Sequence, residues 1–126
     1  VLLCKAEIEN NLNGPAAALP YLNQIRARAG APEYGKHNRF PAPSTKEAMN
    51  DAILKERGYE LVFEFQRRAD LIRFGKYEEV VNAHLKKLGI AQPTNVTSSL
   101  RYFPYPLNDA QLNPNLAAEN PSRLPK

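Results

Sequence analysis

The sequence predicts an all-α protein, and three observations favour this fold class. Apolar residues recur every three or four positions in several separate stretches, as on the buried face of an amphipathic helix. Gly and Pro residues fall between these stretches, where helices end and begin. The last third of the chain is rich in proline and has no helical period. We therefore expect a single domain over 1–126, with a helical body over 1–89 and an irregular tail over 90–126 packed on it.

The composition is that of a globular protein and excludes several functional classes. The chain has 126 residues, of which 43% are hydrophobic and 24% are charged, enough for one domain with a modest core. Its net charge of +4 comes from basic residues interspersed with acidic ones, without a basic stripe that carries aromatic residues. We therefore expect no nucleic-acid partner. The chain opens without an initiating methionine or a signal peptide, so we expect a fragment of a longer protein.

The first helix is expected over 1–12 and the second over 16–29, joined by Asn13-Gly14-Pro15. So short a turn requires two antiparallel helices that cover each other's apolar faces. The residues expected on the buried faces are Val1, Cys4, Ile8 and Leu12 in the first helix, and Ala18, Leu22, Ile25 and Ala29 in the second. Cys4 is interpreted as a small buried hydrophobe, because Leu3 before it does not fit a lipoprotein cleavage site.

The loop over 31–44 is the candidate ligand site. It has three prolines, and Tyr34 and Phe40 look like exposed aromatics. Long ordered loops often carry function, so we expect ligand contacts from Tyr34, His37 and Arg39. The alternative is an exposed crossover without a ligand.

A long central helix is expected from about Thr45 to Gly75, continuous or bent near Gly58. Ser44 and Glu47 have the spacing of a capping box at its start. The residues expected on its buried stripe are Ile53, Leu61, Phe65, Ala69 and Ile72.

The charges of this helix allow three interpretations. Glu56, Glu60 and Glu64 step by four along one face, with arginines three or four positions from a carboxylate. The first interpretation is a solvated face with weak pairs such as Asp70 with Arg73. The second is that a partner surface, or the rest of a larger protein, fixes some of these charges. The third, a di-metal cluster, is excluded because no Glu-x-x-His occurs.

A fourth helix is expected from about Tyr77 to Leu88, followed by the proline-rich tail. The residues expected to face inward are Tyr77, Val81, His84, Leu85 and Leu88. In the tail, Leu100 to Phe103 predicts at most a short strand, and Asn108 is expected to cap one helical turn over Asp109 to Leu112.

Catalytic machinery is not recognisable in the sequence. One cysteine and two isolated histidines offer no expected Cys-His pair, and no phosphate-binding loop, zinc spacing or nucleophile elbow occurs. We therefore expect no enzyme, no catalytic residue, no metal site and no cofactor.

Three segments together resemble the C-terminal part of SusD/RagB family proteins. The hairpin ending in Tyr21-Leu22-Asn23-Gln24-Ile25-Arg26-Ala27-Arg28-Ala29-Gly30 resembles that family's tetratricopeptide-like hairpin. The stretch from Ile53 to Gly75 is similar to its central signature helix, except that Phe65 stands where the family usually has Gly. Phe103-Pro104-Tyr105-Pro106, with Leu112 to Asn115 and Glu119 to Pro121, is similar to its closing segment.

This resemblance implies a surface-exposed lipoprotein of the outer membrane in a Bacteroidetes-type bacterium. Such a protein captures oligosaccharides or other nutrients without catalysis and passes them to a TonB-dependent SusC-like transporter. Its membrane contact would be made only through an N-terminal lipid anchor outside this chain. The alternative, suggested by the hairpin, is a helical-repeat scaffold that mediates protein–protein interaction, and a glycan-processing enzyme is a third hypothesis.

Overall fold

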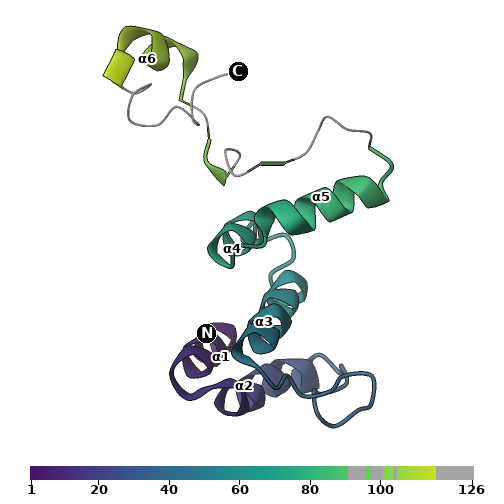
Figure 1. Cartoon of the computed structure of the whole chain (residues 1–126). Coiled ribbons are helices and arrows are strands. Elements are labelled where there is room, and N and C mark those ends of the chain that lie inside the picture. The colour runs from purple at the N-terminus through teal and green to yellow at the C-terminus, as the bar shows by residue number, and fades with distance from the viewer. Residues whose placement is uncertain (91–95, 98–100, 104, 116–126) are drawn as a thin grey trace. The chain divides into compact units, whose positions relative to one another are not determined.

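The computed structural model describes residues 1–90, 96–97, 101–103 and 105–115. These residues form the helices α1 to α6 and no strand, which confirms the all-α prediction (Figure 1). The chain forms two compact units, Val1–Phe74 and Gly75–Lys126, and each has its own internal contacts. The single domain over 1–126 stays a prediction.

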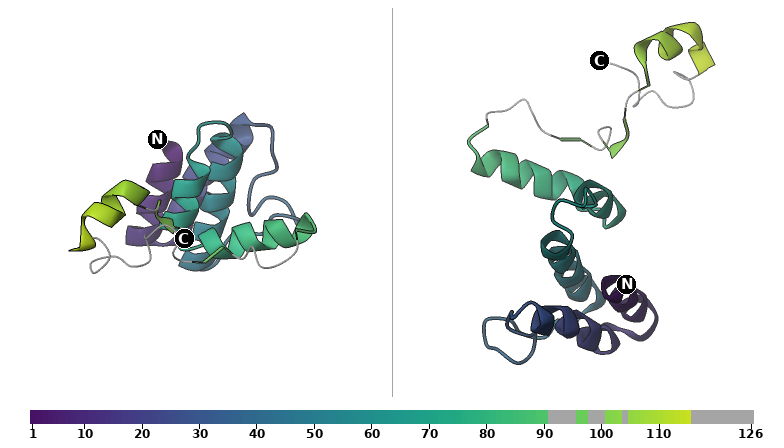
Figure 2. Two further views of the ribbon diagram at one scale, coloured as in Figure 1. Left: turned by 90° about the horizontal axis from the view of Figure 1, so that it is seen from above. Right: turned by 180° about the vertical axis from the view of Figure 1, so that it is seen from behind.

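The predicted helical hairpin is confirmed in the first unit. Helix α1 (Leu2–Asn13) and helix α2 (Pro15–Arg28) meet at Gly14, whose φ of 91° is a backbone conformation that glycine adopts without strain. Pro15 is then the first residue of α2, where its missing N–H costs nothing. The views in Figure 2 show α1, α2 and α3 (Lys46–Glu60) packed together.

The buried face of α1 differs from the predicted one. Leu3, Ala6 and Asn10 are buried, whereas the predicted residues Val1, Cys4, Ile8 and Leu12 are exposed. Both sets have helical spacing, so periodicity does not distinguish them. Burial of the first set places the Asn10 amide against α3, where Nδ2 donates to the backbone oxygen of Lys46 and to Oδ1 of Asn50, each at 2.8 Å.

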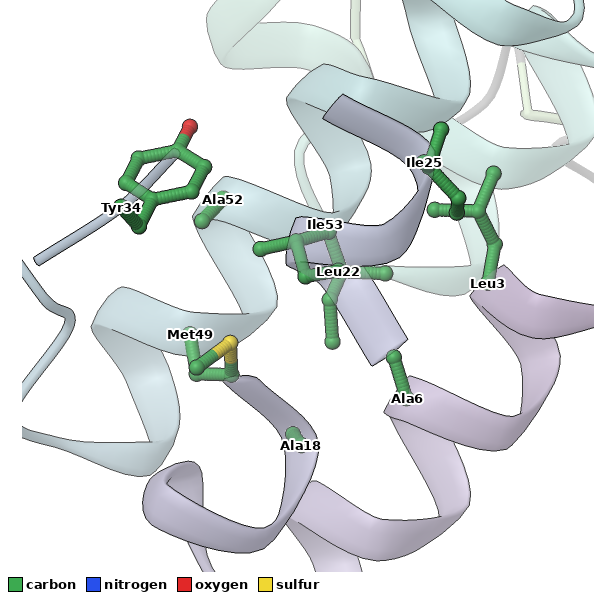
Figure 3. Packing of buried hydrophobic residues seen from close by; sticks show 9 residues of the cluster. All are labelled: Leu3, Ala6, Ala18, Leu22, Ile25, Tyr34, Met49, Ala52 and Ile53. Atoms are coloured by element: carbon green, nitrogen blue, oxygen red, sulfur yellow. The ribbon is translucent and has the colours of Figure 1, made fainter. Parts of the chain in front are cut away.

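The hydrophobic core lies where α2 and α3 meet the start of α1. Leu22, Met49 and Ile53 are fully buried at its centre, and Ala6 and Ala18 lie beside them (Figure 3). The predicted inward residues of α2 are confirmed except Ala29, which is exposed because the helix ends at Arg28.

The continuous central helix was a wrong prediction. Helix α3 ends at Glu60, residues 61–66 form a turn, and α4 (Arg67–Arg73) follows. Phe63 and Phe65 have positive φ angles of 66° and 57°, which interrupt a right-handed helix. Of the predicted stripe, Phe65 is therefore 95% exposed.

Side-chain contacts hold α4 against α3 across this turn. Arg67 Nη1 donates to the backbone oxygen of Leu54 at 2.7 Å, and Arg57 Nε donates to Asp70 Oδ2 at 2.8 Å. The guanidinium of Arg67 lies 3.0 Å from where a Cβ on Gly58 would stand, so Gly58 allows this close approach. The predicted bend near Gly58 is thus a break of the helix a few residues later.

The start of α3 also differs from the predicted capping box. Thr45 is the N-cap residue, and its Oγ1 accepts a hydrogen bond from the Ala48 N–H at 3.1 Å. Ser44 and Glu47 had the spacing of a capping box but lie one position away from this cap.

The second unit contains α5 (Tyr77–Lys87) and α6 (Leu107–Leu112). Helix α5 has no buried residue, and the predicted inward residues His84 and Leu88 are exposed. Contacts between the tail and α5 include the pair of Arg101 with Glu78, and the Asn82 side chain bonds both backbone groups of Val96.

Two predictions for the tail have mixed outcomes. Helix α6 begins at Leu107 after Pro106, just before the predicted Asn108 cap. Leu100 of the predicted strand and Glu119 to Pro121 of the closing segment lie outside the described residues, and 101–103 form no strand.

Candidate functional site

The loop over 31–44 is fixed by side chains of α2. Asn23 lies on the buried side of this helix, and its amide makes two hydrogen bonds with the backbone of Tyr34. Nδ2 donates to the Tyr34 oxygen at 3.0 Å, and Oδ1 accepts from the Tyr34 N–H at 2.9 Å. One turn further along α2, Arg26 Nε donates to the backbone oxygen of Pro32. Because these backbone groups are satisfied by helix side chains, the first half of the loop is held in one conformation.

A buried ion pair connects this anchor to α3. Arg26 Nη1 pairs with Glu56 Oε1, and the two side chains are only 5% and 7% exposed. The Tyr34 hydroxyl donates to the same Glu56 oxygen at 3.4 Å. The guanidinium carbon of Arg26 also lies 4.5 Å from the centre of the Tyr34 ring and 4.6 Å from that of Phe40, within cation–π range.

The predicted solvated face of acidic residues is therefore wrong for Glu56. Its partner Arg26 is on α2 of the same chain, so neither a solvated face nor a partner surface describes this charge. Glu60 likewise pairs with Arg28 of α2, although the Arg28 side chain is 66% exposed. The predicted pair of Asp70 with Arg73 is confirmed at 3.3 Å.

Tyr34 is a neutral phenol at physiological pH. Burial raises its pKa above the ordinary value, and the adjacent Glu56 carboxylate raises it further, while Arg26 lowers it. The dominant cause is burial, because an ionised phenolate loses hydration in the interior. Tyr34 therefore serves as a hydrogen-bond donor to Glu56.

The second half of the loop is a tight hairpin built on Tyr34. The Gly35 N–H donates to the Phe40 oxygen at 2.7 Å, and the Phe40 N–H donates to the His37 oxygen at 2.9 Å. Gly35 has a φ of 80°, and a Cβ there would lie 3.2 Å from the Ala42 Cβ, so the turn requires glycine. The rings of Tyr34 and Phe40 then meet edge to face, with centres 6.0 Å apart.

The second half of the 31–44 loop and α3 line an open depression of about 490 Å³. Most of its surface is apolar, and two of its lining side chains are cationic. The lining residues are Tyr34, Arg39, Phe40, Pro41, Ala42, Pro43, Ser44, Ala48, Ala52 and Lys55. Apolar walls with a few polar groups are typical of small-molecule sites.

The structure brings two of the three predicted site residues to this depression. Tyr34 and Arg39 line it, whereas His37 is exposed beside it and uses Nδ1 to accept from the Arg39 N–H at 3.3 Å. Tyr34 was expected to be exposed, but it is 8% exposed and belongs to the core. Its burial follows from the anchors on Asn23 and Glu56, which no sequence period reveals.

Sequence reasoning missed Lys55 as part of this depression. Ala48, Ala52 and Lys55 follow the helical spacing of four and three, so they lie on one face of α3. That spacing was readable from the sequence, but the position of the loop over that face was not.

Neither a metal centre nor a membrane span is found in the part of the chain that the structure describes. No group of three or more His, Cys, Asp or Glu side chains there is placed to hold a metal ion. None of the described helices has the length and hydropathy needed to cross a bilayer. Cys4, expected to be buried, is exposed with its Sγ 3.8 Å from Arg57 Nη1.

The comparison with protein families agrees with the helical hairpin and the segment after it. The profile of the SusD family matches residues 1–122. The chain belongs to the SusD family. Proteins of the SusD family bind glycans or other nutrients without catalysis and pair with SusC-type transporters.

Curated relatives come from the bacterium Formosa agariphila. The chain is 38% identical over 114 residues to SusD-like protein P25, covering 90% of this chain and 21% of the relative. It is 31% identical over 127 residues to SusD-like protein P2, covering 96% of this chain and 24% of the relative. The chain therefore spans about a quarter or less of the length of these SusD relatives. No solved structure matches the chain significantly.

Proposed function

We propose that the intact protein captures glycans or other nutrients at the outer membrane and delivers them to a TonB-dependent SusC-like transporter. The observation that carries this proposal is the SusD family match over residues 1–122. A second part of the proposal is that this chain is the C-terminal part of a surface-exposed lipoprotein whose lipid anchor lies in the N-terminal part. The relatives' length supports only that the intact protein is longer than this chain.

The proposed role is binding without chemical change of the ligand. Non-catalytic carbohydrate binding is the property of the family that supports it. The depression beside the 31–44 loop is the place in this chain that we propose for a ligand contact, with exposed Arg39 and buried Tyr34 among its lining residues. His37 is proposed as a further contact from the same loop, because its ring is exposed beside Phe40.

Calorimetric titration of the intact protein against a panel of neutral and acidic oligosaccharides and peptides tests this function. We expect saturable binding of at least one glycan or peptide, with no product detected by chromatography after prolonged incubation. Turnover of the ligand would contradict the non-catalytic role and favour a glycan-processing enzyme.

Co-purification tests the transporter and separates this proposal from the scaffold alternative. We expect the tagged intact protein to retain a SusC-like transporter in detergent extracts of the outer membrane. Absence of any ligand in the panel, together with stable association to proteins other than a transporter, would favour a helical-repeat scaffold. The described residues give that alternative one hairpin, because α3 is followed by the seven-residue α4 and not by a second hairpin of similar length.

A further inference from the structure

Two cations of the first unit have no polar partner among the residues that the structure describes. Five basic side chains of Val1–Phe74 pair with carboxylates in the described structure: Arg26 with Glu56, Arg28 with Glu60, Lys36 with Glu33, Arg57 with Asp70, and Arg73 with Glu7 and Asp70.

The remaining basic side chains mostly have other contacts. Lys46 and Arg67 donate to backbone oxygens of Asn11 and Leu54, and Lys5 lies over the Tyr21 ring. The side chains of Arg39 and Lys55, both exposed, have no ion-pair or hydrogen-bond partner among the residues that the structure describes. These two cations line the same depression.

The depression also lacks a negative charge to neutralise them. None of its lining residues is acidic. Glu56, the neighbour of Lys55 in sequence, is buried and held by Arg26 and Tyr34. Glu33 of the same loop pairs with Lys36, and both of those residues line a different depression. The formal charge of the residues that line the depression is therefore positive.

We propose that this depression binds an acidic oligosaccharide through a carboxylate or sulfate group held by Arg39 and Lys55. This inference rests on the proposed capture function and adds the chemical class of the ligand. A guanidinium can bind the two oxygens of a carboxylate or sulfate in parallel, and an ammonium adds a second charge. The half-buried Phe40 and the rings of Pro41 and Pro43 give the C–H face of a sugar an apolar surface beside those cations.

Titration with matched neutral, uronate-bearing and sulfated oligosaccharides tests the proposal on the intact protein. We expect both acidic ligands to bind at least about tenfold more tightly than the neutral one, a difference of about 1.4 kcal/mol. Their affinity should fall as the salt concentration rises, because the cations are exposed. Lowering the pH toward about 3.5, the pKa range of a carboxyl group, should weaken the uronate more than the sulfate, which distinguishes the two groups.

Three variants locate the effect. Arg39→Gln and Lys55→Gln should each weaken acidic ligands by about tenfold, a loss several times larger than that for the neutral one. Lys36→Gln is the matched control, since it removes the same charge from the same loop but lines the other depression. Its affinity for every ligand should stay within about twofold of that of the wild type, or roughly 0.4 kcal/mol.

The outcomes separate this inference from the function on which it rests. Equal affinity for neutral and acidic ligands, unchanged in Arg39→Gln and Lys55→Gln, would overturn the inference and leave nutrient capture intact. Absence of binding to any oligosaccharide or peptide would overturn both. Inorganic sulfate that competes as strongly as the sulfated sugar would show a simple anion site and overturn the assignment to an oligosaccharide.

Discussion

Arg26 and Glu56 form an ion pair that water scarcely reaches, between α2 and α3. Removing one partner leaves a buried charge without compensation, which costs about 3 to 5 kcal/mol in other proteins. We expect Glu56→Gln to lower the free energy of unfolding by about 3 kcal/mol, measured by urea denaturation. Glu60→Gln is the control, because its partner Arg28 is mostly exposed and the expected loss is below about 1 kcal/mol. Equal losses in the two variants would contradict the importance of burial.

Because the pKa of Tyr34 is raised, we expect the free energy of unfolding to depend on pH in the alkaline range. The unfolded state releases the phenol proton near its ordinary pKa of 10.0, whereas the folded state holds it to a higher pH. Between the two pKa values the folded state binds more protons, so its stability falls as the pH rises. The contribution is complete below pH 10 and is lost as the pH rises through the folded pKa.

Tyr34→Phe should remove this part of the pH dependence. We expect the free energy of unfolding of the variant to decline less than that of the wild type between pH 9 and pH 11, followed by urea denaturation at each pH. A Tyr34→Phe profile parallel to the wild type would argue against the raised pKa.

The turn over 61–66 connects α3 to α4 and sets the direction in which α4 leaves α3. Phe65 has a φ of 57°, and its side chain is 95% exposed, so it strains the backbone without packing. A left-handed conformation costs a residue other than glycine about 1 to 2 kcal/mol. We expect Phe65→Gly to raise the free energy of unfolding by about 0.5 to 1 kcal/mol after the loss of backbone entropy in glycine.

Tyr59→Gly is the control for Phe65→Gly. Tyr59 lies within α3, where glycine lowers stability by about 1 kcal/mol or less. Thermal unfolding of both variants should therefore show shifts of opposite sign. A lower melting temperature for Phe65→Gly would mean that the phenyl ring stabilises the turn.

The 31–44 loop is anchored to α2 by side-chain hydrogen bonds. Asn23→Ala removes both hydrogen bonds to the Tyr34 backbone and leaves a buried N–H and C=O unsatisfied, at a cost of about 1 to 3 kcal/mol. We expect faster amide hydrogen exchange at Tyr34 and a lower free energy of unfolding. Gln24→Ala on the exposed side of α2 should change neither quantity. Unchanged exchange at Tyr34 in Asn23→Ala would show that other contacts hold the loop.

The division into two units predicts how the whole molecule unfolds. Every buried hydrophobic residue of the described chain lies between Leu3 and Leu71, and α5 has none. A chain shortened to 1–74 should therefore keep its helical circular dichroism and a cooperative thermal transition. We expect a melting temperature within about 5 °C of the original, the shift that about 1 kcal/mol produces in a domain of this size.

Shortening to 1–66 is the matched comparison for this truncation. It removes α4, including buried Leu71 and the Asp70 carboxylate that pairs with Arg57. We expect a much lower melting temperature and a broader transition. A chain of 1–74 that fails to unfold cooperatively would mean that residues after Phe74 stabilise the first unit.

Much of the element order could be predicted from the sequence. The hairpin, the core face of α2 and the start of α3 near Thr45 follow from helical period, Gly14-Pro15 and a capping hydroxyl, which act within a few residues. The candidate site was predicted in part, because composition identified the 31–44 loop and Arg39 but missed Lys55 and the burial of Tyr34. Loop composition carries no information on which helix the loop covers.

The all-α class, the hairpin and the family could be predicted from the sequence alone, because these depend on local period, turn residues and ordered motifs. Tertiary structure decided which of two apolar faces α1 buries, and it placed Glu56 in the interior with Arg26. It also broke the central helix after Glu60, where bonds from Arg57 and Arg67 hold α4 against α3. These choices depend on contacts between residues more than ten positions apart, and helical period within one segment does not encode them.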